Sequence, residues 1–141
     1  MVIKIPACII NQIDTLYYLY ENVEVGGVLL GSKDFSGFTV TNIVYNLRNK
    51  SLYAYYFNRT IHDIADEITH IINSNNNINY IGEWHTHPKQ QSMFSIRDRI
   101  SFLDLNKDFE QLILLIKGAD GYSSYTYMNG VIAKTEIAMG E

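Results

Sequence analysis

The chain has 141 residues, of which 47% are hydrophobic and 18% charged, so it can bury an ordinary core without disulfides or other cross-links. We therefore expect a single domain spanning residues 1–141. The net charge of −4 and the scattered lysines and arginines argue against nucleic acid as a direct partner, and no apolar run is long enough to cross a membrane.

The chain has one cysteine, Cys8, and therefore cannot form an internal disulfide. This cysteine count favours a reducing compartment, and we expect the protein in the cytoplasm. Cys8 lies in the apolar run Pro-Ala-Cys-Ile-Ile at residues 6–10. Because a thiol in apolar surroundings is usually packed and unreactive, we expect a buried packing residue and not a catalytic thiol.

The first third of the chain predicts a strand, a helix and a hairpin. Apolar residues recur at helical spacing after a short N-terminal apolar segment. The turn formers Lys-Asp-Phe-Ser-Gly at residues 33–37 then separate an apolar run from an alternating one, which indicates two strands of a hairpin. The predicted elements are a strand at 2–5, a helix at 7–20 and hairpin strands at 26–32 and 38–45.

The rest of the chain continues this mixture of helices and strands. An amphipathic segment ends at the asparagine-rich loop of residues 73–77, and Asn129-Gly130 predicts a tight hairpin turn. The predicted elements are strands at 52–57, 79–84, 112–116, 122–128 and 131–137, and helices at 60–72 and 95–105. This order predicts an α/β or α+β fold in which helices pack on the faces of a sheet.

Two histidines follow directly on the predicted strand at residues 79–84. His85 and His87 are two residues apart, so an extended chain projects both imidazoles to the same side, where they can meet one ion. Pro88 then ends the extended run.

A carboxylate is placed to complete this pair. After a loop at residues 89–94, the next helix begins near Ser95, and Asp98 falls in its first turn. Two histidines and one carboxylate leave a fourth position for water, which is typical of a catalytic zinc site. Mg²⁺ or Ca²⁺ would require more oxygen ligands than this segment offers.

Amide hydrolysis at such a site needs a general base, and no His-Glu-x-x-His motif supplies one. Glu24 is the best candidate, because it precedes two glycines that permit close backbone approach and then an apolar strand. Glu21 and Glu83 are rivals. Glu83 would face the same side of its strand as His85, although we expect a surface carboxylate at that position.

Each of these features also has a simpler interpretation. Ser95 and Asp98 fit a capping box, in which a serine and a downstream acid satisfy the first free amides of a helix. A His-x-His pair in a strand can be incidental, and Glu24 can be a solvated loop acid. The combination of five such residues at fixed offsets nevertheless favours a metal site, and capping and catalysis can coexist.

The combined pattern resembles a known signature. Glu24, then His85-Thr86-His87-Pro88, then six residues and Ser95-x-x-Asp98 resemble the motif of the JAMM (MPN-plus) zinc metalloproteases. The resemblance covers nearly the whole chain, and the phrase Tyr-Ile-Gly-Glu-Trp before the histidines is more similar to the compact bacterial members. It implies a mixed, curved β-sheet flanked by helices, the MPN/JAB (cytidine-deaminase-like) fold.

The resemblance also assigns roles to residues. It implies one zinc ion per chain, bound by His85, His87 and Asp98. Glu24 would be the catalytic acid and base, and Ser95 would help to stabilise the oxyanion.

The function implied by the family is isopeptidase or peptidase activity. Such an enzyme hydrolyses the amide bond after the Gly-Gly C-terminus of a ubiquitin-like protein, by deconjugation or by precursor processing. By analogy, its partners would include conjugation-type enzymes of the same operon, as in bacterial anti-phage defence systems. Alternatives are processing of a sulfur-carrier protein, and a non-catalytic scaffold domain of the same fold. Retention of all five signature residues argues against the scaffold.

Eleven tyrosines are unusual for a chain of this length, and three cluster in one predicted strand. Tyr53, Tyr55 and Tyr56 lie in the segment that, in related enzymes, is near the groove for the extended substrate tail. A strand edge there could bind a Gly-Gly tail by strand addition. Tyrosine is also a common strand residue, so packing alone can account for the cluster.

Overall fold

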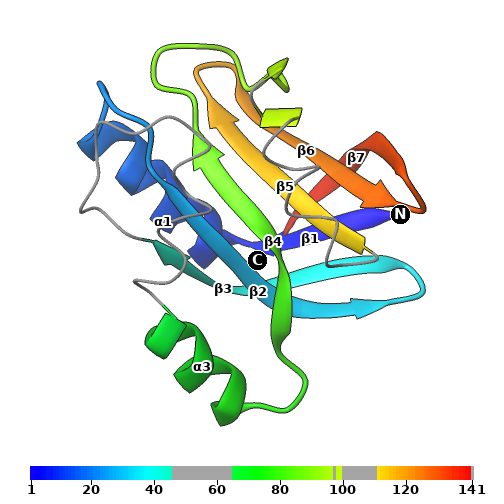
Figure 1. Cartoon of the computed structure of the whole chain (residues 1–141). Helices are drawn as coiled ribbons and strands as arrows, with labels where there is room; N and C mark the ends of the chain where they lie inside the picture. The colour runs from blue at the N-terminus through cyan, green and yellow to red at the C-terminus, as the bar shows by residue number, and fades with distance from the viewer. Residues whose placement is uncertain (46–64, 97, 100–110, 141) are drawn as a thin grey trace.

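The computed structural model of the chain describes residues 1–45, 65–96, 98–99 and 111–140 (Figure 1). Within these ranges the elements are β1 (Val2–Pro6), α1 (Ala7–Leu19), β2 (Gly26–Asp34), β3 (Gly37–Tyr45), α3 (Ala65–Ser74), β4 (Asn79–Thr86), β5 (Gln111–Gly118), β6 (Gly121–Met128) and β7 (Val131–Gly140). The predicted strand at 52–57 and most of the predicted helix at 95–105 lie outside the described residues. The predicted α+β class is confirmed.

The strands form one mixed sheet that closes on itself in the order β1-β3-β2-β4-β5-β6-β7. β2 pairs antiparallel with β3 and β4, and β6 pairs antiparallel with β5 and β7, whereas β4 runs parallel to β5. β1 runs parallel to both β3 and β7 and thereby joins the two ends of the sheet. The family resemblance implied a mixed, curved sheet; the observed sheet is mixed and closes into a barrel.

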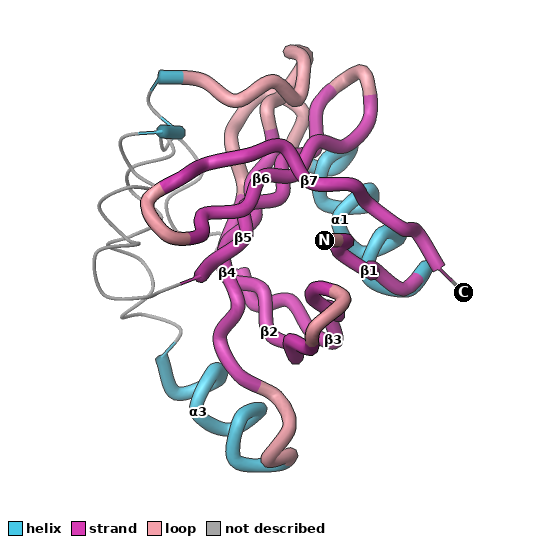
Figure 2. Tube along the Cα trace, turned by 90° about the vertical axis from the view of Figure 1, so that its right-hand side faces the viewer, coloured by secondary structure: helices cyan, strands magenta, loops and turns pink. Residues whose placement is uncertain are grey.

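Two helices pack on opposite faces of this sheet, as Figure 2 shows. We call the face that packs against α1 the inner face and the face that packs against α3 the outer face. Ile9, Ile13 and Leu16 of α1 share the main core with Trp84 and other inner-face residues. Isoleucines of α3 cover Val28, Leu30 and Val44 on the outer face. Both faces are therefore apolar along much of their length.

β4 contains an irregularity that decides which of its side chains lie outside. The pairing of β2 with β4 shifts by one residue, so that Leu29 is opposite Gly82 and Leu30 is opposite Tyr80. A side chain at Gly82 would come within 2.0 Å of the carbonyl oxygen of Ile113, so only glycine fits this close approach. After the bulge, alternation places Trp84 on the inner face and leaves its neighbours in sequence on the outer face.

Helix α1 also corrects one prediction. Because Ile9 and Ile13 face the sheet, the neighbouring Cys8 points away from it and is exposed, not buried as we expected. Neither helix of the described ranges has the length and apolar character needed to cross a membrane.

Candidate metal centre

The two histidines lie where β4 ends. His85 sits between two neighbouring strands, opposite Gly26 of β2 and Ile116 of β5. His87 follows β4 directly, and its N–H donates to the carbonyl oxygen of Lys117 at 2.8 Å. Alternation along this extended segment sends both rings to the outer face, where their Nε2 atoms are 3.2 Å apart. Both side chains are buried.

Asp98 contacts both rings. Its Oδ1 is 3.0 Å from His85 Nε2, and its Oδ2 is 3.1 Å from His87 Nε2. Only 2% of Asp98 is exposed, so water does not shield these contacts. The structure therefore brings together the three residues that the sequence proposed as ligands, with their donor atoms converging on one point of the outer face.

Ser95 and Asp98 also form the capping box that the simpler interpretation described. The Ser95 N–H donates to Asp98 Oδ2 at 3.0 Å, and the Asp98 N–H donates to Ser95 Oγ at 3.0 Å. The Ser95 carbonyl oxygen accepts the N–H of Arg99 at 3.0 Å, which is the first helical hydrogen bond. Because Asp98 uses the same carboxylate for the cap and for the histidines, the helix start fixes its orientation. Ser95 itself is exposed.

Glu24 approaches the histidines from the start of β2. One possible ligand atom from each of Glu24, His85 and His87 can be chosen so that all three lie within 4.8 Å of one another. Glu24 is half-buried, whereas the rival Glu21 is exposed. Of these two acids the structure brings Glu24, and not Glu21, to the histidine pair.

The backbone around Glu24 is held by close strand contacts. The next residue, Val25, exchanges two hydrogen bonds with Thr86, the residue between the two histidines. The Thr86 N–H donates to the Val25 carbonyl oxygen at 2.8 Å, and the Val25 N–H donates to Thr86 Oγ1 at 3.0 Å. A side chain at Gly27 would lie 1.9 Å from the carbonyl oxygen of Val44, so this glycine is required for the approach of β3.

Glu83 differs from the expected surface carboxylate. It is only 6% exposed and lies on the outer face between Val28 and Leu114, its partners on the two adjacent strands. Burial raises the pKa of Glu83 to about 8. The prediction that Glu83 faces the same side of the strand as His85 agrees with this placement, but the prediction of solvent exposure was wrong because the surrounding apolar side chains cover it.

The electrostatics of the cluster follow from its contacts. Burial alone would raise the pKa of Asp98, but hydrogen bonds with His85 and His87 outweigh it and hold that pKa far below the usual range. For His87, burial acts to lower the pKa, and the hydrogen bonds with Asp98 and the Gln91 carbonyl oxygen outweigh it and raise the pKa. Asp98 is therefore an anion, and the site favours positive charge between its side chains.

The second ring nitrogen of His87 has a fixed partner. Its Nδ1 lies 2.9 Å from the carbonyl oxygen of Gln91. A carbonyl oxygen can only accept, so Nδ1 carries the proton and the neutral ring presents the lone pair of Nε2 to the cluster. A backbone carbonyl in this position is a common orienting partner for a metal-binding histidine.

The loop that carries Gln91 is anchored to the β5–β6 hairpin. Its backbone donates from Ser92 to Asp120 Oδ1 at 2.7 Å and from Phe94 to the Tyr125 hydroxyl at 3.1 Å. The Phe94 and Tyr125 rings stack at 4.6 Å. The loop is thus attached at Ser92 and at Phe94, and it leads directly into the helix start that holds Asp98.

Sequence reasoning missed the residues that orient the site. Thr86 stood inside the motif as an unspecified position, and Gln91 acts through its backbone, which no residue type reveals. Gly118 at the end of β5 was a detectable signal, because glycine in a strand often marks a close backbone approach. A side chain there would lie 2.4 Å from the Ser92 nitrogen.

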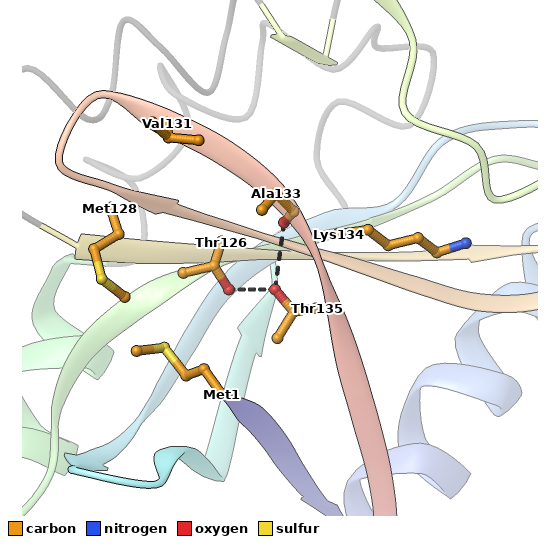
Figure 3. Close-up of a pocket in the computed structure, with 7 residues that line it drawn as sticks. All are labelled: Met1, Thr126, Met128, Val131, Ala133, Lys134 and Thr135. Carbon is orange, nitrogen blue, oxygen red and sulfur yellow. Dashed lines mark hydrogen bonds between the residues drawn. The ribbon is translucent and has the colours of Figure 1, made fainter.

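The three tyrosines Tyr53, Tyr55 and Tyr56 lie outside the described residues. A cavity of about 350 Å³ exists elsewhere, lined by Met1, Thr126, Met128, Val131, Ala133, Lys134 and Thr135 (Figure 3). Thr126 and Met128 alternate along β6 with Tyr125 and Tyr127, which pack with Leu114 on the outer face, so the cavity lies on the inner side of the sheet, whereas the histidine rings lie on the outer face. This cavity is therefore separate from the histidine cluster.

The donor atoms define what the cluster can bind. Two imidazole nitrogens and a carboxylate are ligands that suit zinc and related transition metals, whereas Mg²⁺ and Ca²⁺ prefer oxygen. The half-buried Glu24 carboxylate adds a proton acceptor beside them. The cluster could thus hold a divalent metal ion with a basic group next to it.

Comparisons with known proteins agree with this architecture. The family model described as prokaryotic homologs of the JAB domain matches residues 19–130. The matched region contains Glu24, both histidines and Asp98. Among curated proteins, none matches the sequence.

A solved structure shares the fold. The chain is similar to the solution structure of protein DSY2949 from Desulfitobacterium hafniense, with a TM-score of 0.73 and 18% sequence identity. The similarity covers 99% of this chain and 93% of that one. The common fold therefore extends over essentially the whole chain.

Proposed function

Because this chain belongs to the prokaryotic homologs of the JAB domain, we propose that it is a zinc-dependent peptidase acting after the C-terminus of a ubiquitin-like protein. The observation that carries the proposal is the convergence of Glu24, His85, His87 and Asp98 from separate segments of the chain. A purely structural cluster would not need a second carboxylate beside the buried histidine–aspartate group.

In this proposal His85, His87 and Asp98 hold one zinc ion per chain. The donor set fits zinc, because His87 presents its Nε2 lone pair and Asp98 is an anion. When bound, zinc supplies a Lewis acid that polarises a carbonyl oxygen and lowers the pKa of water to about 7.

Glu24 moves the protons of the reaction. Its carboxylate accepts a proton from the attacking water as the new bond to the amide carbon forms. It then donates that proton to the leaving nitrogen as the amide bond breaks, so the acid and base roles balance over one turnover. The half-buried position next to the histidine pair supports this role for Glu24 over the exposed Glu21.

Ser95 stabilises the negative charge that develops on the carbonyl oxygen. Its Oγ already accepts the N–H of Asp98, which orients the hydroxyl and leaves its proton to donate. The side chain is exposed beside the buried cluster, where an incoming peptide can reach it. Removal of one such donor typically costs about 2.7 to 4 kcal/mol of transition-state stabilisation.

The substrate class rests on the family and not on a described groove. We propose a protein partner with a Gly-Gly C-terminus, released from a conjugate or trimmed from a precursor. Tyr53, Tyr55 and Tyr56 would contribute to binding its extended tail. Conjugation-type enzymes of the same operon would supply such conjugates in a bacterial ubiquitin-like or anti-phage defence system.

The proposal is tested with zinc-loaded protein and ubiquitin-like fusions that carry a Gly-Gly junction. The wild-type chain should contain about one zinc and cleave after the second glycine. Glu24→Gln should keep the zinc and lose on the order of 10²- to 10⁴-fold in kcat. Glu21→Gln, a change to an exposed acid three residues away, is the matched control and should cleave like the wild type.

The alternatives give different results. Cleavage confined to sulfur-carrier fusions would keep the chemistry and replace the substrate. A wild-type protein without zinc affinity and without cleavage of either fusion would instead indicate a scaffold domain. Cleavage that persists in Glu24→Gln would remove Glu24 from the mechanism.

A further inference from the structure

Thr86, the residue between the two histidines, is 1% exposed and makes an unusual hydrogen bond across the sheet. In an antiparallel ladder, every second facing pair exchanges two backbone N–H···O bonds, and the pairs in between exchange none. Here Thr86 and Val25 make one such bond, from the Thr86 N–H to the Val25 carbonyl oxygen at 2.8 Å. The Val25 N–H donates instead to the Thr86 hydroxyl oxygen at 3.0 Å.

This side-chain bond acts at the residue next to Glu24. The ladder between β2 and β4 ends at the pair Gly26 and His85, so the chain leaves the regular sheet at Val25. Without the Thr86 hydroxyl, the N–H of the peptide unit between Glu24 and Val25 would lose the acceptor that it has across the sheet. The hydroxyl fixes the amide of that peptide unit and therefore the direction from which the Glu24 side chain departs.

We propose that Thr86 is a positioning residue, whose hydroxyl sets the place of Glu24 beside the histidine pair through the Val25 amide. This inference rests on the proposed function, since it concerns the residue that moves the proton. The motif segment would then have two functions: His85 and His87 on the outer face would hold the metal ion, and Thr86 between them binds the Val25 amide next to Glu24.

The geometry predicts a separation of two properties. Glu24 is not a ligand in the proposed site, so its displacement should leave zinc binding intact. Proton transfer instead depends on the exact reach of Glu24, and a misplacement of about 1 Å can cost on the order of 10²-fold in rate. Loss of the Thr86 hydroxyl should therefore lower kcat while the zinc affinity and KM change little.

The test compares three variants of the full zinc-loaded chain. Thr86→Val keeps the shape and removes the acceptor, whereas Thr86→Ser keeps the hydroxyl. Thr126→Val removes a buried threonine hydroxyl of β6, which hydrogen-bonds to Thr135 of β7, and so controls for a general loss of stability. The measurements are zinc per chain, kcat and KM on a Gly-Gly fusion, and hydrogen exchange of the Val25 amide.

We expect Thr86→Val to lower kcat by about 10- to 100-fold with zinc content and KM within about 3-fold of wild type. Its Val25 amide should exchange at least about 10-fold faster, because that amide has lost its acceptor. Thr86→Ser should stay within about 3-fold of the wild-type kcat, and Thr126→Val should leave kcat unchanged.

Other results overturn the inference. Unchanged kcat in Thr86→Val, loss of zinc together with activity, or an equal loss in Thr126→Val would each contradict a positioning role. If Thr86→Val does not fold, hydrogen exchange of the Val25 amide in the wild type is the deciding measurement. Exchange as fast as that of an exposed amide would show that the Val25 N–H is not hydrogen-bonded to Thr86, and would contradict the inference. Failure of the wild type to bind zinc or cleave would refute the proposed function, whereas these variant results refute only the role of Thr86.

Discussion

Gly118 is the position where the smallest substitution should disturb the metal centre without touching a ligand. A methyl group there would lie 2.4 Å from the Ser92 nitrogen and 2.6 Å from the Gln91 carbonyl carbon, whereas ordinary contacts begin at 3.4 Å. These neighbours are backbone atoms, so the loop must retreat by about 1 Å. The same loop supplies the Gln91 oxygen that accepts from His87 Nδ1 at 2.9 Å.

The magnitude follows from that displacement. A retreat of about 1 Å stretches the contact of His87 with Gln91 beyond hydrogen-bond range. Loss of an orienting partner of this kind typically lowers metal affinity by about 10- to 100-fold. Overpacking should also lower the free energy of unfolding by about 1 to 3 kcal/mol. Gly118→Ala should therefore bind zinc more weakly although all its proposed ligands are present.

The assay is a competition titration in which a chelator of known affinity takes zinc from the folded protein, with thermal unfolding as a second measurement. Gly140→Ala is the control, because a side chain at Gly140, the last residue of β7, meets only open space. A folded Gly118→Ala protein with wild-type zinc affinity would refute the reasoning that the loop orients His87.

Three further predictions concern side chains of the site. Asp98→Ala removes a proposed ligand, so chelator competition should show a fall in zinc affinity of at least about 10²-fold. Ser95→Ala should keep zinc, lower kcat by about 10²- to 10³-fold, and lower the free energy of unfolding by about 1 kcal/mol through loss of the cap; unchanged kcat would exclude an oxyanion role. Glu83 has a pKa of about 8 in the folded chain against an ordinary value of 4.5, so zinc-free protein should lose stability as pH rises between these values, by at most about 5 kcal/mol. Urea unfolding at both limits should show a smaller loss of stability in Glu83→Gln than in the wild type, because only the contribution of His87, whose pKa is also raised, remains.

The strands and helices could be predicted because their signals are local. The predicted helix at 7–20 corresponds to α1 (Ala7–Leu19), and the hairpin around Asn129-Gly130 is confirmed, with both turn residues at positive φ. β7 extends to Gly140, three residues beyond its predicted end, because its last five residues pair with β1. That pairing joins segments more than a hundred residues apart, and no local pattern indicates it.

The candidate site divides in the same way. Strand alternation predicted that His85 and His87 would share a side, and the helix start predicted where Asp98 would lie. The orienting contacts depend on tertiary packing: the hydroxyl of Thr86 reaches another strand, and the Gln91 carbonyl oxygen is placed by a loop held against β5 and β6. Glu83 shows most clearly what the sequence cannot predict. Strand alternation predicts the face on which its side chain lies, but the burial of that side chain depends on residues from other strands.

Protons and metal ions compete for the same atoms of the cluster. His87 carries one proton on Nδ1, toward Gln91, so a second proton on Nε2 makes the ring a cation that pairs with Asp98. The raised pKa of His87 reflects that pairing. Zinc requires the same Nε2 lone pair and the same carboxylate, and its binding must release whatever protons lie there. Acid and zinc therefore compete for one group of atoms, and the short contacts that favour a proton between His87 and Asp98 are the ones that prepare the site for a divalent cation.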